Sequence, residues 1–262
     1  MYLYPTLIDN PKYKKNKKNG GVIPPITDER VKYVPIGCQK CIECRRQKVN
    51  MWRTRLLEEI KHNYLNAHFI TLTFTDEALQ ELSTTIQKTI QATGYDLDNA
   101  IVTLSIRRWL ERIRKTTGKS VKHWLIPEIG GNGTERIHIH GIIWTDNIQS
   151  ILNKWNNGRT VKGKYVNERT VNYIVKYMQK EDTVHKNYIP KIHTSPGIGA
   201  GYINTYNAGK NKYNGKETKA TYTTRDGTTA QLPIYYKNKL YTDDEREKLW
   251  LHLLDKTGRT SP

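Results

Sequence analysis

Apolar residues recur at three- and four-residue spacing in several stretches of the chain, and this spacing predicts helices. The first stretch contains Val49, Trp52, Leu56 and Ile60, which stand among charged residues. A later stretch follows Asp146, whose side chain is placed to cap the predicted helix. After the first stretch, helices are predicted over residues 78–90, 105–117, 146–155, 169–180 and 242–256.

A different pattern, in which apolar and polar residues alternate, predicts strands at 68–75, 123–129 and 136–144. The Gly-rich segment 130–134 between the last two strands favours a tight turn, so we expect them to form a hairpin. Strands and helices do not alternate regularly over these segments. This organisation favours an α+β fold over a doubly wound sheet.

The chain is strongly basic: 43 Lys and Arg stand against 25 Asp and Glu, a formal net charge of +18 over 262 residues. Such a protein usually binds a polyanion, either nucleic acid or an anionic membrane surface. No stretch approaches the roughly 20 apolar residues that span a bilayer, and no signal-peptide segment opens the chain. We therefore expect a soluble protein of cytoplasmic character, with residues 1–35 as a basic extended arm.

His138 and His140 stand two positions apart on a predicted strand, so both side chains point to the same face of the sheet. Their imidazoles can converge there on one divalent metal ion or on one phosphate. If the hairpin pairs Glu128 with Arg136 or with His138, the Glu128 carboxylate shares that face. Two histidines and a carboxylate bind Mg²⁺, Mn²⁺ or Zn²⁺ and leave positions open for substrate. The alternative is two histidines on the polar side of a half-exposed strand.

Tyr173, Tyr177 and Lys180 fall on one face of the helix predicted over 169–180, and its aliphatic residues form a stripe on a nearly opposite face. The alternative is a tyrosine pair packed at an edge. With a metal site on a basic protein, a tyrosine nucleophile indicates phosphodiester cleavage by covalent attack. Lys180, or Lys176 one turn from Tyr173, would stabilise the developing charge. Two phenols on one face suggest two successive transfers.

This combination resembles the HUH endonucleases, with His138-Ile139-His140 as the HUH motif and Tyr173-x-x-x-Tyr177 as a two-tyrosine motif. More narrowly, the chain is similar to the rolling-circle replication initiators of microviruses of the gokushovirus type, which are small single-stranded-DNA viruses of bacteria. The similarity spans nearly the whole chain from about residue 35. Its supporting segments are GCQKCIECRRQ (37–47), FITLTF (69–74), PEIGGNGTERIHIHG (127–141), YIVKYMQK (173–180), SPGIGAGY (195–202) and LPIYYKNKLY (232–241).

The resemblance implies an antiparallel sheet with the HUH strand at its centre and helices packed against it. It implies a nicking and joining core over 36–190 and a C-terminal extension over 191–262. The protein would use Mg²⁺ or Mn²⁺ to nick viral single-stranded DNA at an origin, hold the 5′ phosphate on a tyrosine, and leave a 3′-hydroxyl. A host polymerase and helicase would then act in the host bacterial cytoplasm. The helicase is expected from the host because the chain has no complete G-x-x-x-x-G-K-S/T motif for ATP: Gly118-Lys119-Ser120 is preceded by Ile113 where the motif needs its first glycine.

The sequence departs from the family at two places. Ile137 precedes the first histidine where proline is common, and a β-branched residue there suits a strand. The family's cysteine motif is usually Cys-Gly-x-Cys-x-x-Cys, whereas here Cys38, Cys41 and Cys44 follow at two-residue intervals after Gly37. These thiols either bind zinc, with a distant histidine as the fourth ligand, or pack as three reduced cysteines at a helix start.

The helix over 105–117 carries a cluster of cations, which we expect to contact DNA phosphates; the alternative is a solvated basic face. Two other functions compete with nicking. One is a non-catalytic single-stranded DNA-binding protein, and the other is a metal-dependent phosphoesterase that uses water instead of a tyrosine. The cations predicted to contact DNA are Arg107, Arg108, Arg112 and Arg114.

Overall fold

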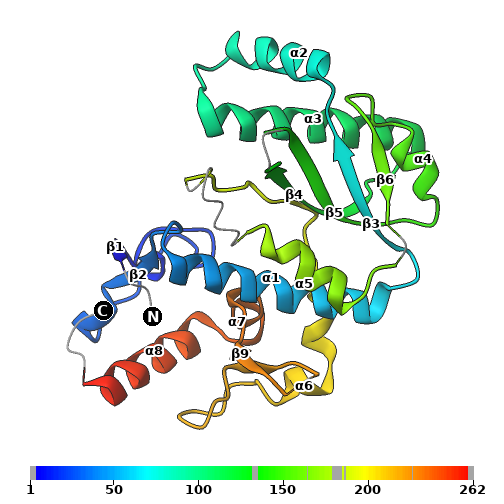
Figure 1. The fold of residues 1–262 in the computed structure, drawn as a ribbon. Helices are drawn as coiled ribbons and strands as arrows, with labels where there is room; N and C mark the ends of the chain where they lie inside the picture. The colour runs from blue at the N-terminus through cyan, green and yellow to red at the C-terminus, as the bar shows by residue number, and fades with distance from the viewer. Residues whose placement is uncertain are drawn as a thin grey trace. The chain divides into compact units, whose positions relative to one another are not determined.

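The computed structural model describes residues 4–131, 135–163, 165–178, 185, 187–225 and 227–258. The chain forms two compact units, one made of Met1–Thr54 with Ala200–Pro262 and the other of Arg55–Gly199 (Figure 1). The division of the chain at 1–35, 36–190 and 191–262 stays a prediction. Over the described ranges, no helix is long and apolar enough to cross a membrane.

The Arg55–Gly199 unit is built on a five-stranded sheet in which every pairing is antiparallel. The predicted hairpin is confirmed, and the strand that carries both histidines lies at the centre of the sheet. The α+β fold is therefore confirmed. The strands lie in the order β6 (Thr160–Lys162), β3 (Ala67–Thr73), β5 (Ile137–Trp144), β4 (Lys122–Ile129) and β7 (His193–Thr194).

One face of this sheet is covered by three helices, α2 (Asp76–Gln87), α3 (Gly94–Thr117) and α4 (Ile148–Leu152) (Figure 1). Alternate residues of β3, β4 and β5 bury their aliphatic side chains against these helices, around the fully buried Trp109 of α3. Burial of apolar surface is the main stabilising contribution to such a layer. This core covers one face of the sheet. On the other face, Trp124, Ile126 and Ile142 are buried as well, and polar side chains share that face with them.

Two of these helices correct the predictions. α3 begins at Gly94 instead of residue 105, because Ile101 and Val102 continue its buried stripe toward the N-terminus. The predicted cap of α4 is wrong: Asn147, not Asp146, accepts a hydrogen bond from the main-chain N–H of Ser150, at 3.1 Å. An N-cap side chain must reach the amide three residues ahead of it. Because the helix begins one residue later than predicted, Asn147 and not Asp146 stands at that distance.

Helix α5 (Glu168–Lys176) lies on the opposite face of the sheet from α2 and α3 (Figure 1). A capping box formed by Asn167 and Thr170 fixes its start. The helix was predicted to extend to residue 180, but it ends at Lys176 with Tyr177 as its C-cap. Lys180, at the predicted end of this helix, lies outside the described residues.

Gly141 on β5 is required by the close approach of β4. A Cβ atom at this position would stand 2.1 Å from the main-chain oxygen of Trp124, which no side chain tolerates. The absence of a side chain at Gly141 lets β4 and β5 approach to the spacing that their hydrogen-bond ladder needs. Gly141 follows His140, so this close pairing lies next to the second histidine. The glycine after the second histidine therefore has a structural function.

The other unit begins with two paired strands, β1 (Pro5–Asp9) and β2 (Tyr33–Gly37), joined by a segment with 3₁₀ turns at Pro11–Tyr13 and Glu29–Val31. Helix α1 (Ile42–Asn63) follows, and its last turns belong to the Arg55–Gly199 unit. In the N-terminal segment, Lys12 forms ion pairs of 2.8 and 2.9 Å with Asp244 and Glu247.

The C-terminal part of this unit has its own small core, in which tyrosines replace aliphatic residues. Tyr202, Tyr222, Tyr236 and Tyr241 are all buried there, so part of the chain's content of 17 tyrosines has a structural function. The elements of this part are η3 (Ala200–Asn204), α6 (Tyr206–Gly209), β8 (Thr221–Thr223), β9 (Thr229–Gln231), α7 (Ile234–Leu240) and α8 (Asp243–Thr257).

Candidate active site

The two histidines of β5 face away from the helical core. Their neighbours Ile137 and Ile139 are buried among the helices, so the strand's alternation turns His138 and His140 to the face on which α5 lies. The ladder pairs Glu128 of β4 directly with His138. Directly paired residues point to the same side, so the carboxylate and both imidazoles share this face.

His140 is held by contacts on both of its ring nitrogens. Its Nε2 lies 3.1 Å from the Glu128 Oε2, and its Nδ1 lies 3.0 Å from the hydroxyl of Thr71 on β3. The side chains of His140 and Glu128 are only 12% and 16% exposed. These two partners fix the ring's orientation. In a metal-binding histidine the nitrogen that does not face the metal is held by such a partner, and here Thr71 is placed to hold Nδ1 in this way.

Thr71 and Phe69 belong to this site and were not among the predicted residues. Phe69 lies parallel to the His140 ring, at 6.2 Å between centroids and 3° between planes. The alternation of β3 could have indicated only that both residues share one face, and the pairing of β3 with β5 turns that face to the histidines. Ile70 and Leu72 are buried in the helical core, so the residues on either side of Ile70 must face the histidines.

Helix α5 brings both tyrosines to the histidines. Its aliphatic stripe is buried, and this orients the helix so that Tyr177 stacks on His140 at 4.7 Å between centroids and 10° between planes. The Tyr177 hydroxyl donates a hydrogen bond to the Tyr173 hydroxyl, and Tyr173 also meets the edge of Phe69. The structure thus gathers five of the predicted residues on one face, namely Glu128, His138, His140, Tyr173 and Tyr177.

Burial and charge shift two pKa values in this cluster. Burial is the main cause that raises the pKa of Tyr177 well above its ordinary value, and the hydrogen bond with Tyr173 and the charge of Glu128 add to it. Burial, together with the neighbouring His140, lowers the pKa of His138. At neutral pH Tyr177 is therefore a protonated phenol, and His138 is a neutral imidazole with a lone pair to offer a metal ion.

Two of the three predicted donors, His140 and Glu128, have the spacing of two ligands on one divalent metal ion. Two ligands of an octahedral Mg²⁺ or Mn²⁺ stand about 3 Å apart at metal–ligand distances near 2.1 Å, and the His140–Glu128 contact of 3.1 Å has this spacing. His138 is the adjacent third donor, with its ring 6.2 Å from that of His140. In the described part of the chain, only Cys38, Cys41 and Cys44 bring three such donor atoms within 4.8 Å of one another. His138 is thus gathered less tightly than the other two.

The predicted cations lie in other places. Lys176 is on α5 with an exposed side chain, and Lys180 lies outside the described residues. The arginines of α3 are on the helical layer, on the opposite side of the sheet from the histidines (Figure 1). Their contact with DNA stays a prediction, and so does the charge-stabilising role of both lysines.

Three of the four α3 arginines have partners within the unit. Arg112 donates to the main-chain oxygen of Lys154 at 3.0 Å and to the Asn156 side chain at 2.6 Å. Arg108 and Arg114 form surface ion pairs with Glu81 and Glu111, respectively. Exposed pairs of this kind contribute little to stability, so they would yield readily to a phosphate. Arg112 is tied to the end of α4 and has a structural function.

The sequence model of one protein family matches the chain over residues 67–182, and this family is described as the replication-associated protein of the ORF2 type. The match runs from β3 past α5, so it contains every residue gathered around His140. It supports an assignment of the chain as a rolling-circle replication initiator that binds DNA. No curated protein and no solved structure matches the chain.

Proposed function

We propose that this protein is a metal-dependent endonuclease and strand transferase of the HUH type. It nicks and joins single-stranded DNA at a replication origin, and so initiates and terminates rolling-circle replication. The observation that supports this most is the stacking of Tyr177 on His140, which itself contacts Glu128. A phenol in this position can reach a phosphate bound at the histidines, and neither a simple DNA-binding protein nor a water-dependent phosphoesterase has a use for it.

Glu128, His138 and His140 would hold the metal ion, Mg²⁺ or Mn²⁺. When bound, the ion supplies Lewis-acid polarisation of the scissile phosphate. The residues themselves orient the reacting groups: Thr71 and Glu128 fix the His140 ring, and that ring supports the Tyr177 phenol by stacking. The phenol is thereby held near the phosphate before it attacks.

In the nicking step, the Tyr177 oxygen bonds to the phosphorus and the bond from phosphorus to the 3′ oxygen breaks. The product is a 5′-phosphotyrosine, and the departing oxygen takes up a proton to become a free 3′-hydroxyl. The phenol's own proton has a route outward, because Tyr177 donates to the Tyr173 hydroxyl and Tyr173 is 49% exposed. Deprotonation of Tyr177 occurs with the attack, since its pKa is too high for a standing phenolate.

Tyr173 performs the second transfer. Its hydroxyl is next to that of Tyr177, so it can attack the phosphodiester at the end of the replicated strand. The free 3′-hydroxyl of the displaced strand then attacks the first phosphotyrosine, which closes a circle and restores Tyr177. Two tyrosines whose hydroxyls are hydrogen-bonded to each other act in turn, because ionising both at once would place two negative charges in contact.

The resemblance of the segments described above supports a microvirus of the gokushovirus type as the source of this activity. The substrate would then be viral single-stranded DNA in the host bacterial cytoplasm. The host polymerase extends the 3′-hydroxyl, and a host helicase opens the duplex ahead of it. This assignment is the finer part of the proposal, and it rests on the sequence segments that surround the two motifs.

The decisive experiment is the capture of a covalent adduct on an origin oligonucleotide with the full chain and Mg²⁺ or Mn²⁺. Peptide mass spectrometry should find the DNA phosphate on Tyr177, and on Tyr173 after the second transfer. Tyr177→Phe should impair the first cleavage most, Tyr173→Phe should leave cleavage and lose joining, and the double variant should form no adduct. Tyr165→Phe, at an exposed tyrosine outside the site, is the matched control.

Each competing function has its own outcome in this experiment. Cleavage that persists in the double tyrosine variant would indicate a phosphoesterase that uses water. Binding without cleavage by the wild type, over all origin oligonucleotides and metals tried, would indicate a non-catalytic single-stranded DNA-binding protein. DNA attached to any residue other than the two tyrosines would overturn the assignment of the nucleophile.

A further inference from the structure

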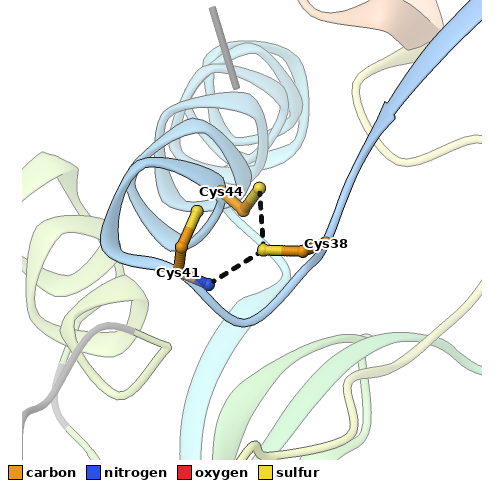
Figure 2. A group of neighbouring side chains, drawn as sticks. All are labelled: Cys38, Cys41 and Cys44. Atoms are coloured by element: carbon orange, nitrogen blue, oxygen red, sulfur yellow. Dashed lines mark hydrogen bonds between the residues drawn. The ribbon is translucent and has the colours of Figure 1, made fainter. Parts of the chain in front are cut away.

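A second cluster of potential metal ligands lies in the other unit, where β2 leads into α1. Cys38 follows β2, Cys41 precedes α1, and Cys44 is in the first turn of that helix. Figure 2 shows the three sulfur atoms turned toward one another across this junction. They all lie within 4.8 Å of one another, and the sulfurs of Cys38 and Cys44 are 3.9 Å apart.

The main chain is bent so that an amide group points at one of the sulfurs. The N–H of Cys41 donates to the Cys38 sulfur at 3.3 Å (Figure 2). To allow this turn, Gln39 adopts a left-handed conformation with φ of 62°, which a residue with a side chain rarely does. Amide donors stabilise a thiolate over a thiol, and left-handed residues concentrate at functional sites.

The spacing of the sulfurs fits one metal ion. Zinc binds thiolate sulfur at about 2.3 Å, so two sulfurs on a tetrahedral zinc stand roughly 3.8 Å apart. The Cys38–Cys44 separation of 3.9 Å has this value. Three sulfurs within 4.8 Å also leave room for a single ion and not for a cluster of several metals.

We propose that Cys38, Cys41 and Cys44 bind one Zn²⁺ ion that fastens the end of β2 to the start of α1. Cys44 is buried, while Cys38 and Cys41 are partly exposed, so the cluster is open to water on one side. A water molecule occupies the fourth position there. This is a different class of site from that of the histidines, because soft thiolates select zinc where imidazole and carboxylate accept Mg²⁺ or Mn²⁺.

The first test measures zinc in the full chain, purified without a histidine tag from cells grown with zinc. A His138→Ala/His140→Ala background removes the other candidate site, so any zinc belongs to the cysteines. We expect one zinc per chain by elemental mass spectrometry, and a loss of affinity of more than about 10-fold for Cys41→Ser against a coloured chelator. Ile42→Ser, an exposed neighbour within the same turn, is the matched control and should keep the zinc.

The second test does not depend on the folding of a variant. X-ray absorption of the zinc-loaded protein should show three sulfur neighbours at about 2.3 Å and one oxygen or nitrogen neighbour at about 2.0 Å. Four sulfur neighbours, or a second metal nearby, would overturn the proposal. So would a protein isolated without zinc, either with three freely alkylated thiols or with a mass lower by two hydrogens, which indicates a Cys38–Cys44 disulfide.

Discussion

The histidine cluster and the cysteine cluster gather metal-binding side chains in opposite ways. The cysteines lie within seven positions of one another, and a single turn with one left-handed residue brings them together. The histidine cluster instead takes residues from β3, β4, β5 and α5. The hydrogen bond between Thr71 and His140 alone joins residues 69 positions apart in the sequence.

This difference determines what each cluster depends on. The cysteine cluster needs only its local backbone, so it should bind its ion whenever that turn can form. The histidine cluster needs the strand register and the docking of α5, so damage to the sheet at a distance should disrupt it. The predictions below test whether the two clusters are independent in this sense.

The largest effect is expected when the histidine cluster loses its ligands. His138→Ala/His140→Ala should lower the nicking rate by at least about 10²-fold, because ligand loss should cost no less than the loss of a supporting residue. A chelator should have the same effect on the wild type. Gel assays of oligonucleotide cleavage measure both, and salt-sensitive DNA binding should remain, since the phosphate contacts lie elsewhere.

The zinc content of this double variant provides the comparison. If the two clusters are independent, the cysteines keep their zinc while nicking is lost. Loss of zinc together with nicking would show that the clusters share an ion or a fold. Cleavage that continues in an excess of chelator would argue against a metal at the histidines.

A smaller effect is expected from Thr71→Val, which removes the hydroxyl at 3.0 Å from the His140 Nδ1. Residues that orient a metal ligand typically account for 10- to 100-fold in affinity or rate, so we expect a loss of about this size in metal affinity. Thr84→Val on α2 is the matched control, because the Thr84 hydroxyl bonds to the main chain of Gln80 in its own helix, away from the histidines. Equal effects of the two changes, measured by metal titration, would rule out a specific role for Thr71.

Acid should weaken the sheet that carries the histidine cluster. Burial, with the charge of Lys191, lowers the pKa of His193 on the edge strand β7 to about 4. In the unfolded chain this histidine takes up a proton near pH 6.5, so between about pH 4 and 6.5 the unfolded state binds more protons. The contribution of His193 to the free energy of unfolding is complete above pH 6.5. By pH 5 we expect the free energy of unfolding to fall by an amount on the order of 2 kcal/mol.

Urea unfolding at pH 7.5 and pH 5.0 measures this loss. His193→Gln, which cannot be protonated, should show a smaller difference between the two pH values than the wild type. A variant with the wild-type pH dependence would show that other groups cause the acid sensitivity, among them His123, whose pKa burial also lowers.

The smallest effect concerns the arginines of α3. Arg107→Gln should flatten the dependence of DNA affinity on salt by a slope of about 0.7, the value for one phosphate contact on a single strand. Arg112→Gln should lower stability instead, because Arg112 donates to Lys154 and Asn156. Fluorescence anisotropy over a range of salt concentrations measures the slope. An unchanged slope in Arg107→Gln would identify that side of α3 as a solvated face.

Much of the site could be predicted from β5 and α5 because their periodicities are regular. Alternation in β5 put both histidines on one face, and the spacing of Tyr173 and Tyr177 put both phenols on one side of α5. The hairpin limited Glu128 to two pairings that share the histidine face, and the ladder selected the one with His138. These are short-range consequences of helix and strand geometry.

The contributions of β3 could not be predicted in the same way. Thr71 and Phe69 reach His140 only because β3 pairs with β5, although α2 and α3 lie between the two strands in the sequence. The order of strands in a sheet cannot be predicted from the local spacing of residues. The end of α5 was also missed, since the pattern of apolar residues continued to Met178 while the helix stopped at Lys176. The last helix, predicted over 242–256, is confirmed as α8. The shorter elements before it are not indicated by the pattern, because their core is built of tyrosines.

The strand order has a consequence for the moment at which the histidine cluster is assembled during synthesis. β3 leaves the ribosome well before its partner β5, and closing the loop between them carries an entropic cost. The helical layer of α2 and α3 can offset this cost once it has formed. The tyrosines of α5 emerge later still. A nascent chain therefore contains no assembled histidine cluster until translation has passed Tyr177, whereas the cysteine turn is complete soon after Cys44 emerges.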